Sequence, residues 1–281
     1  MSLITPWDPG PPRAEDRPPA AVCEAVRHTV FGSIASAVAS SCGSVHSVNE
    51  DAHSELGAHR RLFVVADGVG GGAMAALASR QLVSYLHSAL DGQHIGPEAV
   101  GEAVLGADRF IAGSIAELTE SPGAATLALC APLNARGSKW LIAWVGDCRV
   151  YQVSESGEKP VQALTLDDSF ANLHEEPPAG GSPDDPARMV GNGAVSRANV
   201  ALADMKRGDL LVVCSDGVHK HVPPDDLHRL LRVPQSLPQR CEELIALARA
   251  NGSRDDATVL LIQRVGPRLH RPRWLTTGTT P

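Results

Sequence analysis

The feature that most constrains this chain is an apolar strand pattern that repeatedly ends in an aspartate. The strongest copy occupies residues 62–72 (Leu-Phe-Val-Val-Ala-Asp-Gly-Val-Gly-Gly-Gly), where Asp67 follows five apolar residues and a glycine run leads into a helical pattern. Residues 210–218 and residues 141–147 repeat this arrangement and deliver one further aspartate each. Glycine lets the backbone approach an ion or a phosphate closely. The sequence therefore predicts a site built at the ends of buried strands.

A single aspartate-glycine pair after a strand most often forms only a turn. This chain carries further acids at residues 49–51 (Asn-Glu-Asp) and 255–256 (Asp-Asp). Carboxylates that meet at strand ends repel one another, and a bound cation relieves this repulsion. Carboxylates without His or Cys partners favour hard ions such as Mg²⁺ or Mn²⁺. Two such ions can lower the pKa of a water and hold a phosphate for in-line attack.

The order of the predicted elements favours an α+β domain with antiparallel sheets. Two long helical patterns follow one another, and a run of strands without intervening helices comes next, which argues against alternating βαβ units. Strands are expected at 33–40, 62–66, 126–131, 140–145, 150–153, 210–214 and 258–263. Helices are expected at 73–90, 97–118, 224–231 and 237–250.

The ends of the chain lack an apolar periodicity. Residues 1–28 are rich in proline and charge, which predicts a flexible tail with a short helix near Cys23. We expect one domain over residues 29–266 and a C-terminal tail over residues 267–281. Residues 172–193 contain several Pro and Gly and are expected to form a long surface loop or flap.

Charge and composition limit the partners of the chain. The formal net charge is -7 and the pI is about 5.9, which is unlike the basic footprint of a nucleic-acid-binding protein. No apolar run is long enough to span a bilayer, and the first residues lack a leader pattern. The six cysteines form no C-x-x-C pair. We expect a cytoplasmic protein that binds neither nucleic acid nor membrane.

The acidic motifs, taken in order, resemble those of the protein phosphatase 2C (PPM) family, in a divergent bacterial form. The resemblance extends from about Gly32 to Arg264. The motifs that carry it are Asn49-Glu50-Asp51, Asp67-Gly68-Val69-Gly70-Gly71, Gly146-Asp147-Cys148-Arg149, Leu164-Thr165-Leu166-Asp167-Asp168-Ser169, Ser215-Asp216-Gly217-Val218 and Asp255-Asp256-Ala257-Thr258. The resemblance implies an α-β-β-α sandwich of two antiparallel sheets. It also implies hydrolysis of phosphoserine and phosphothreonine by water activated at a binuclear Mg²⁺ or Mn²⁺ centre.

The resemblance also assigns roles to individual residues. Asp67 would bridge both metal ions, and Gly68 would offer its carbonyl oxygen. Asp216 and Asp255 would complete the first metal site, while Asp51 would hold waters of the second metal ion or of the hydrogen-bond shell, with Glu50 close by. These four aspartates are the predicted catalytic and metal-binding carboxylates.

Asp147 matches a family position linked to a third, weaker metal ion, so it is a candidate ligand for that ion.

Several positions depart from the family pattern. His46 stands where the family usually has an arginine that grips the substrate phosphate, so we expect His46 to contact the phosphate. Asp168 replaces a histidine, and Asp256 replaces an asparagine. Residues 124–126 read Ala-Ala-Thr where Gly-Thr-Thr is common.

The sequence thus favours a metal-dependent phosphatase acting on phosphoproteins, in a system with a cognate Ser/Thr kinase. Two alternatives stay open. The loss of the arginine would suit a pseudophosphatase that binds phosphoproteins or regulatory partners without turnover. A hydrolase of small phosphoesters would carry the same carboxylates, and residues 172–193 do not decide between them.

Overall fold

The computed structural model describes residues 20–29, 31–57, 61–120, 123–154 and 160–266. Two antiparallel sheets form its centre. The first sheet has the order β1-β2-β11-β10-β7-β8, with β1 (Ala21–Thr29), β2 (Gly32–Ser41), β11 (Ala257–Val265), β10 (Leu210–Cys214), β7 (Arg149–Val153) and β8 (Val161–Ala163). The second has the order β3-β4-β5-β6-β9, with β3 (Asp51–His53), β4 (Phe63–Val69), β5 (Ala124–Pro132), β6 (Lys139–Val145) and β9 (Asn199–Asp204).

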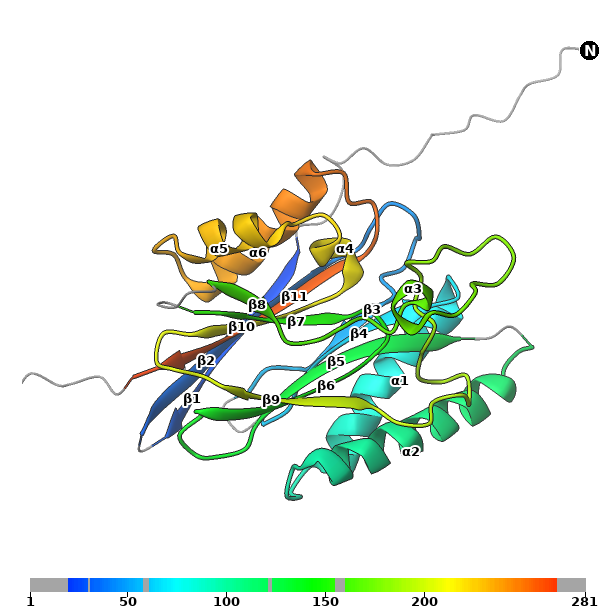
Figure 1. Ribbon diagram of the computed structural model, residues 1–281, viewed down its shortest axis with the longest axis horizontal. Helices are drawn as coiled ribbons and strands as arrows, with labels where there is room; N and C mark the ends of the chain where they lie inside the picture. The colour runs from blue at the N-terminus through cyan, green and yellow to red at the C-terminus, as the bar shows by residue number, and fades with distance from the viewer. Residues whose placement is uncertain (1–19, 30, 58–60, 121–122, 155–159, 267–281) are drawn as a thin grey trace, which may run out of the picture.

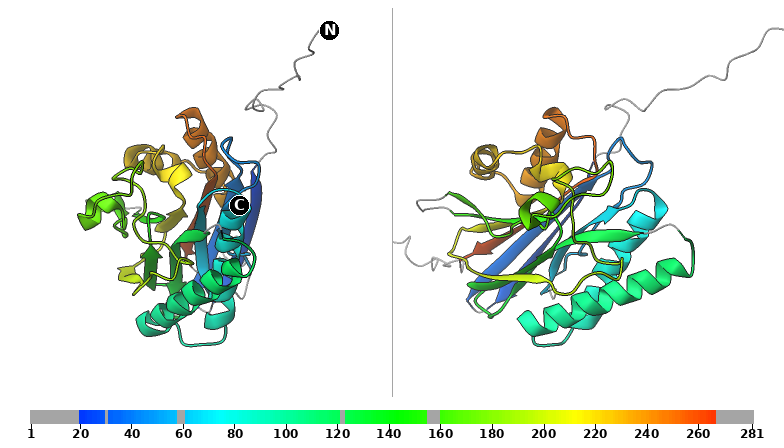
Figure 2. Two further views of the ribbon diagram at one scale, coloured as in Figure 1. Left: turned by 90° about the vertical axis from the view of Figure 1, so that its right-hand side faces the viewer. Right: turned by 45° about the vertical axis from the view of Figure 1, so that its right-hand side comes forward.

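Helices cover the outer face of each sheet (Figures 1 and 2). Helices α1 (Ala73–Leu90) and α2 (Pro97–Ala116) pack on the five-stranded sheet, and α5 (Pro224–Leu231) and α6 (Leu237–Ala250) pack on the six-stranded sheet. Two one-turn helices, α3 (Phe170–Leu173) and α4 (Asp216–His219), follow their strands near one end of the sandwich. This is the α-β-β-α sandwich that the sequence predicts.

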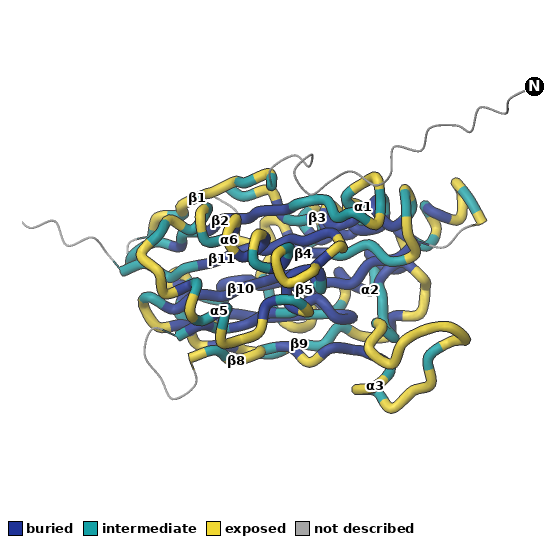
Figure 3. Tube along the Cα trace, turned by 90° about the horizontal axis from the view of Figure 1, so that it is seen from above, coloured by how far each residue is buried: buried dark blue, intermediate teal, exposed yellow. Residues whose placement is uncertain are grey.

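Strand alternation explains why the central strands are apolar on both faces. In β4, Phe63 and Val65 point between the two sheets, while Val64 and Ala66 pack against α1 and α2. The fully buried Trp140 lies between the sheets, with its ring centroid 5.9 Å from that of Phe63. Figure 3 shows the buried residues concentrated in these central strands. The strand ends that carry the acids are therefore held by a packed core.

The long elements agree closely with the sequence prediction. Helices α1, α5 and α6 have the predicted bounds, and α2 ends at Ala116 rather than residue 118. All seven predicted strands are present. The prediction missed β1, β3, β8 and β9, together with the two one-turn helices.

The predicted N-terminal tail is wrong at its C-terminal end, and so is the predicted helix near Cys23. Residues Ala21–Thr29 form β1, which pairs with β2 along its whole length. The strand lies at the sheet edge and has no fully buried residue, so its sequence lacks an apolar run. Residues 1–19 and 267–281 lie outside the described residues.

The predicted loop at 172–193 is confirmed beyond the end of α3 at Leu173, since no further helix or strand occurs there. Asp108 of α2 holds the C-terminal end of this loop. Its Oδ1 accepts hydrogen bonds from the backbone N–H groups of Gly191 and Gly193 at 2.6 and 3.1 Å. Among the described residues, no helix is long and apolar enough to span a membrane.

Removal of β1 should destabilise the domain, because it would expose the backbone groups on the outer edge of β2. We expect a variant lacking residues 1–29 to melt at least about 5 °C below the full chain, since each kcal/mol corresponds to about 2–4 °C in a domain of this size. A variant lacking residues 1–19 is the matched control and should melt with the full chain. Equal melting temperatures for both truncations would show that β1 contributes nothing to stability.

Candidate metal centre

The strand register brings the predicted carboxylates together. Asp51 of β3 lies directly opposite Asp67 of β4 in the antiparallel ladder. Asp216 follows β10 at the start of α4, and Asp255 lies two residues before β11. Residues from both sheets therefore supply the site, which lies where these strand ends meet.

A cleft of about 440 Å³ opens over these strand ends, and we call it the acidic cleft. Its lining contains the predicted Asp67, Gly68, Asp147 and Asp216, together with the exposed Asp255. The residues that complete its lining are His46, Glu50, Val69, Gly70, Gly71, Phe170, Pro178, Asp185, Pro186, Met189 and Lys220.

Asp51 lies outside the lining of the cleft and is almost fully buried, with 7 % exposure. The Ser215 hydroxyl donates a 2.7 Å hydrogen bond to its Oδ2, and the Thr258 N–H in turn donates to that hydroxyl. The other oxygen of Asp51 is buried without a hydrogen-bond partner among the described residues, and the same is true of Oδ1 of Asp216. Buried carboxylate oxygens without partners are costly, and they fit the ligand chemistry of a hard cation.

Two glycines are required where backbone segments approach each other in this site. A Cβ atom at Gly68 would collide with the backbone of Ala75 in α1. A Cβ atom at Gly217 would collide with the carbonyl of Asp256. Glycine at these positions lets the Asp-Gly turns pack against the neighbouring backbone, which fixes Asp67 and Asp216.

Asp256 and Glu50 hold the backbone around the cleft. The two oxygens of Asp256 accept the N–H groups of Gly43 and Glu50, both at 2.6 Å, and so join the loop before β3 to the start of β11. Glu50 Oε1 accepts the N–H of Gly72 at 2.5 Å. Ser79 of α1 donates to the Glu50 carbonyl at 2.5 Å. These two acids are thus engaged in backbone hydrogen bonds.

Burial and crowding change the acidity of the carboxyls. Burial, reinforced by the charges of Asp51 and Asp216, raises the pKa of Asp67 well above its ordinary value. Burial also raises the pKa of Asp51 to about 8 and that of Asp147 to about 6. Burial would raise the pKa of Asp216 as well, but the adjacent Lys220 ammonium outweighs it and holds this pKa below its ordinary value. The site therefore binds protons unless another cation replaces them.

His46 lines the cleft and is oriented by Glu50. Its Nδ1 is 2.9 Å from Glu50 Oε1. Its Nε2 lies on the Gly71 side, 3.7 Å from the position that a Gly71 Cβ would occupy. Ligand atoms of His46, Asp255 and Asp256 also lie within 4.8 Å of one another. His46 and Asp255 line the cleft, whereas Asp256 lies outside its lining and is engaged in backbone hydrogen bonds.

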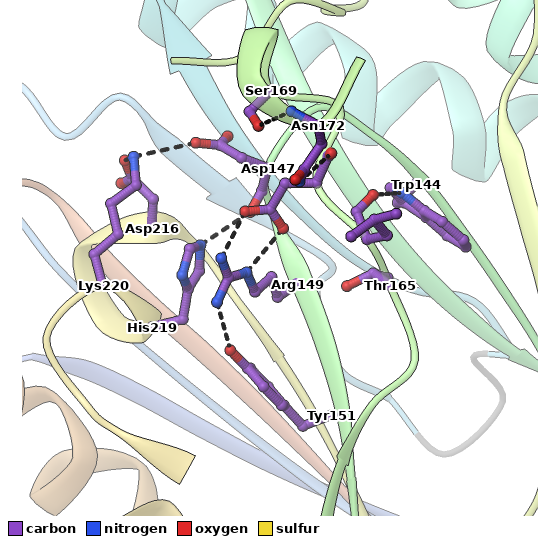
Figure 4. Close-up of polar contacts among 12 residues, drawn as sticks. Trp144, Asp147, Arg149, Tyr151, Thr165, Ser169, Asn172, Asp216, His219 and Lys220 are labelled. Atoms are coloured by element: carbon purple, nitrogen blue, oxygen red, sulfur yellow. Dashed lines mark hydrogen bonds and ion pairs between the residues drawn. The ribbon is translucent and has the colours of Figure 1, made fainter. Parts of the chain in front are cut away.

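Sequence reasoning missed Lys220, whose Nζ lies 2.7 Å from Asp216 Oδ2 and 3.2 Å from Asp147 Oδ2 (Figure 4). A signal was present, because residues four apart on a helical turn face the same side and Lys220 follows Asp216 by four. Beside this contact, Arg149 forms a bidentate ion pair with Asp167 at 2.8 and 2.7 Å.

Comparisons with known proteins agree with this architecture. A family model described as protein phosphatase 2C matches residues 39–255, which is more than half of the chain. The serine/threonine protein phosphatase PstP of Mycobacterium tuberculosis is 27% identical over 231 residues, covering 78% of this chain and 43% of that protein. The serine/threonine phosphatase of Listeria welshimeri is 28% identical over 137 residues, covering 45% of this chain and 52% of that protein. The chain thus spans about half the length of the curated relatives it matches.

Solved structures show the same fold. The catalytic domain of PstP in complex with two manganese ions superposes with a TM-score of 0.69 at 22% identity, covering 83% of this chain and 98% of that one. Stp1 of Staphylococcus aureus superposes with a TM-score of 0.71 at 20% identity, covering 85% and 99% of the two chains.

The crowding at Asp67 leads to a stability prediction. Without metal, Asp67→Asn should melt no lower than the parent protein, because the change removes one carboxylate from a mutually repelling group. Mn²⁺ at about one hundred times its Kd should stabilise the parent by about 2.7 kcal/mol but the variant much less. Thermal melting with and without Mn²⁺ measures both effects.

Asp204→Asn is the matched control, because Asp204 is an exposed carboxylate at the end of β9 and outside the cleft. It should gain as much stability from Mn²⁺ as the parent. An equal gain in Asp67→Asn would show that Asp67 is not a metal ligand.

Proposed function

The chain belongs to the protein phosphatase 2C family, and from that premise we propose that it hydrolyses phosphoserine and phosphothreonine in proteins with the help of bound Mn²⁺ or Mg²⁺. One observation carries the proposal. Carboxylates from separate segments of both sheets line one cleft, and a buried oxygen without a hydrogen-bond partner among the described residues occurs on Asp216 of this cleft and on Asp51, which pairs with the cleft residue Asp67. The PstP catalytic domain has the same fold and was solved in complex with two manganese ions, which supports manganese binding here.

The residues present fit a pair of divalent cations. The two cations would be bound by Asp67, the Gly68 carbonyl, Asp216 and Asp255. Asp51, which lies opposite Asp67 in the ladder, would support the site. When bound, the ions would supply Lewis acidity, which lowers the pKa of a water and offsets phosphate charge. The packed strands fix these carboxylates before substrate arrives, so that little reorganisation is required during the reaction.

Substrate charge must be balanced inside a cleft lined mainly by acids. Among the described lining residues, the basic side chains are His46 and Lys220. Lys220 is engaged with two carboxylates, whereas His46 uses Nδ1 for Glu50 and presents Nε2 on the other side of its ring. We therefore assign His46 to a phosphate oxygen of the substrate.

The cleft geometry bears on the alternatives to protein phosphatase activity. A pseudophosphatase has no need of buried carboxylate oxygens without partners, and keeping them without a cation is costly. The loop residues Pro178, Asp185 and Met189 form one wall of an open cleft, which leaves room for a protein chain as well as a small phosphoester. We propose phosphoproteins as the substrates, and a Ser/Thr kinase must then supply them.

Turnover tests the proposal directly. The protein should hydrolyse a phosphothreonine peptide and p-nitrophenyl phosphate when Mn²⁺ or Mg²⁺ is added and should lose activity with chelator. Asp216→Asn should lower kcat by at least about a hundredfold, which is typical for removal of one preorganised electrostatic group. Asp204→Asn, the exposed control, should retain parental activity.

Three outcomes separate the alternatives. Phosphopeptide binding without turnover in the presence of either metal ion would favour the pseudophosphatase. Turnover of p-nitrophenyl phosphate alone would favour small phosphoesters. Full activity after exhaustive removal of metal would refute the proposed mechanism.

The assignment of His46 predicts a gain of function. His46→Arg should raise kcat/KM by about fivefold, equivalent to about 1 kcal/mol, because guanidinium offers a permanent charge and two parallel donors to phosphate. The buried Glu50 carboxylate that orients His46 would also accept the guanidinium. Steady-state kinetics on the phosphothreonine peptide at saturating Mn²⁺ measures the effect.

His94→Arg is the control, because it adds the same charge at an exposed position before α2 and outside the cleft lining. It should leave kcat/KM unchanged. If His46→Arg behaves like this control, residue 46 does not contact the phosphate.

A further inference from the structure

Lys220 links the two sheets at the acidic cleft. Asp147 follows β6 of the five-stranded sheet, and Asp216 follows β10 of the six-stranded sheet. The ammonium of Lys220 lies between their Oδ2 atoms, at 3.2 Å from the first and 2.7 Å from the second. Figure 4 shows the lysine side chain reaching across from α4 towards Asp147. One ammonium group thus contacts two carboxylates that would otherwise repel each other.

Lys220 balances the charge of Asp147, because the other basic side chains beside Asp147 are engaged with different groups. The Asp147 side chain is 3 % exposed, so water screens it little. His219 lies beside it, but its Nε2 lies 2.9 Å from the backbone carbonyl of Asp147 and is engaged there. Arg149 is engaged by both oxygens of Asp167. Among the described residues, Lys220 makes the ion pair that the structure gives to Asp147.

We propose that Lys220 acts as a built-in cation between Asp147 and Asp216, so that the cleft accepts two divalent ions and Asp147 does not ligate a third. The inference rests on the proposed metal-dependent function and specifies how many ions it uses. A third divalent ion held between Asp147 and Asp216 would need the two Oδ2 atoms that the ammonium already contacts at 3.2 and 2.7 Å, so it could bind there only by displacing Lys220. The Lys220 ammonium, which is part of the chain, thus occupies the place that an exchangeable metal ion would take between the two carboxylates.

The position of Lys220 also affects the resident ions. Asp216 is a proposed ligand of the first metal ion, and Lys220 contacts Oδ2 of this residue. The orphaned Oδ1 of Asp216 stays available for metal. The lysine therefore restricts how Asp216 can bind and holds its carboxylate in position, which makes Lys220 a positioning residue.

Metal counting tests the inference. Equilibrium dialysis against rising Mn²⁺, with titration calorimetry, should give two ions per chain for the parent, and Asp147→Asn should leave that number unchanged. Lys220→Met keeps the length of the side chain without its charge, and it should bind one additional, weaker Mn²⁺. The double variant Lys220→Met with Asp147→Asn should lose that extra ion again. Lys139→Met, which removes an exposed lysine outside the cleft, should match the parent.

Each outcome has a defined meaning. Three ions in the parent, reduced to two by Asp147→Asn, would show that Lys220 moves aside and would overturn the inference. The same would follow if Lys220→Met bound the same number of ions as the parent with the same affinities. A parent that binds no Mn²⁺ would refute the proposed function and this inference with it. Asp147→Asn in the otherwise unchanged chain gives its answer even if Lys220→Met does not fold.

Discussion

Mutual repulsion among buried carboxylates is the constraint on which the arrangement of this protein depends. The ladder between β3 and β4 places Asp51 opposite Asp67, and the turn after β10 adds Asp216. Folding can bring these groups together only if each negative charge is neutralised or balanced. In the metal-free protein the carboxylates are balanced by bound protons, by the hydrogen bond from the Ser215 hydroxyl and by the Lys220 ammonium. Divalent cations would replace the protons. The same repulsion that opposes folding therefore provides the affinity for metal.

The sandwich is well suited to hold such a site. Residues of β4 and β10 are buried on both faces, so their backbones cannot shift without disturbing packing. Asp67 directly follows an apolar stretch of β4, and Asp216 follows β10 after Ser215, on the other sheet. The site consequently forms only when both sheets are packed together. Hydrogen bonds from Gly43 and Glu50 to Asp256 extend this coupling to the loop that carries His46.

The sequence predicts the parts of this structure that are governed by local pattern. Helices α1, α5 and α6 have strong periodicity, and the buried strands are continuous apolar runs. Edge strands such as β1 and β9 are half exposed, so their sequences carry little apolar signal, and only pairing with a neighbour defines them. The acids of the cleft could be found because they end apolar strands. The task of Asp256 could not, because it depends on contacts with segments distant in sequence, and the same holds for the contact of Lys220 with Asp147.

The departures from the family pattern share a physical consequence. Asp168 accepts the N–H of Gly146 at 3.1 Å and is held by the amide of Asn199, so it anchors the turn that carries Asp147. Asp256 anchors the loop that carries His46. Both substitutions place an acid where it binds backbone N–H groups, and neither displaces a proposed metal-binding carboxylate. A further departure, His46, lines the cleft itself. The departures at Asp168 and Asp256 therefore lie among the backbone supports of the site, and the carboxylates proposed to hold the metal ions are unchanged.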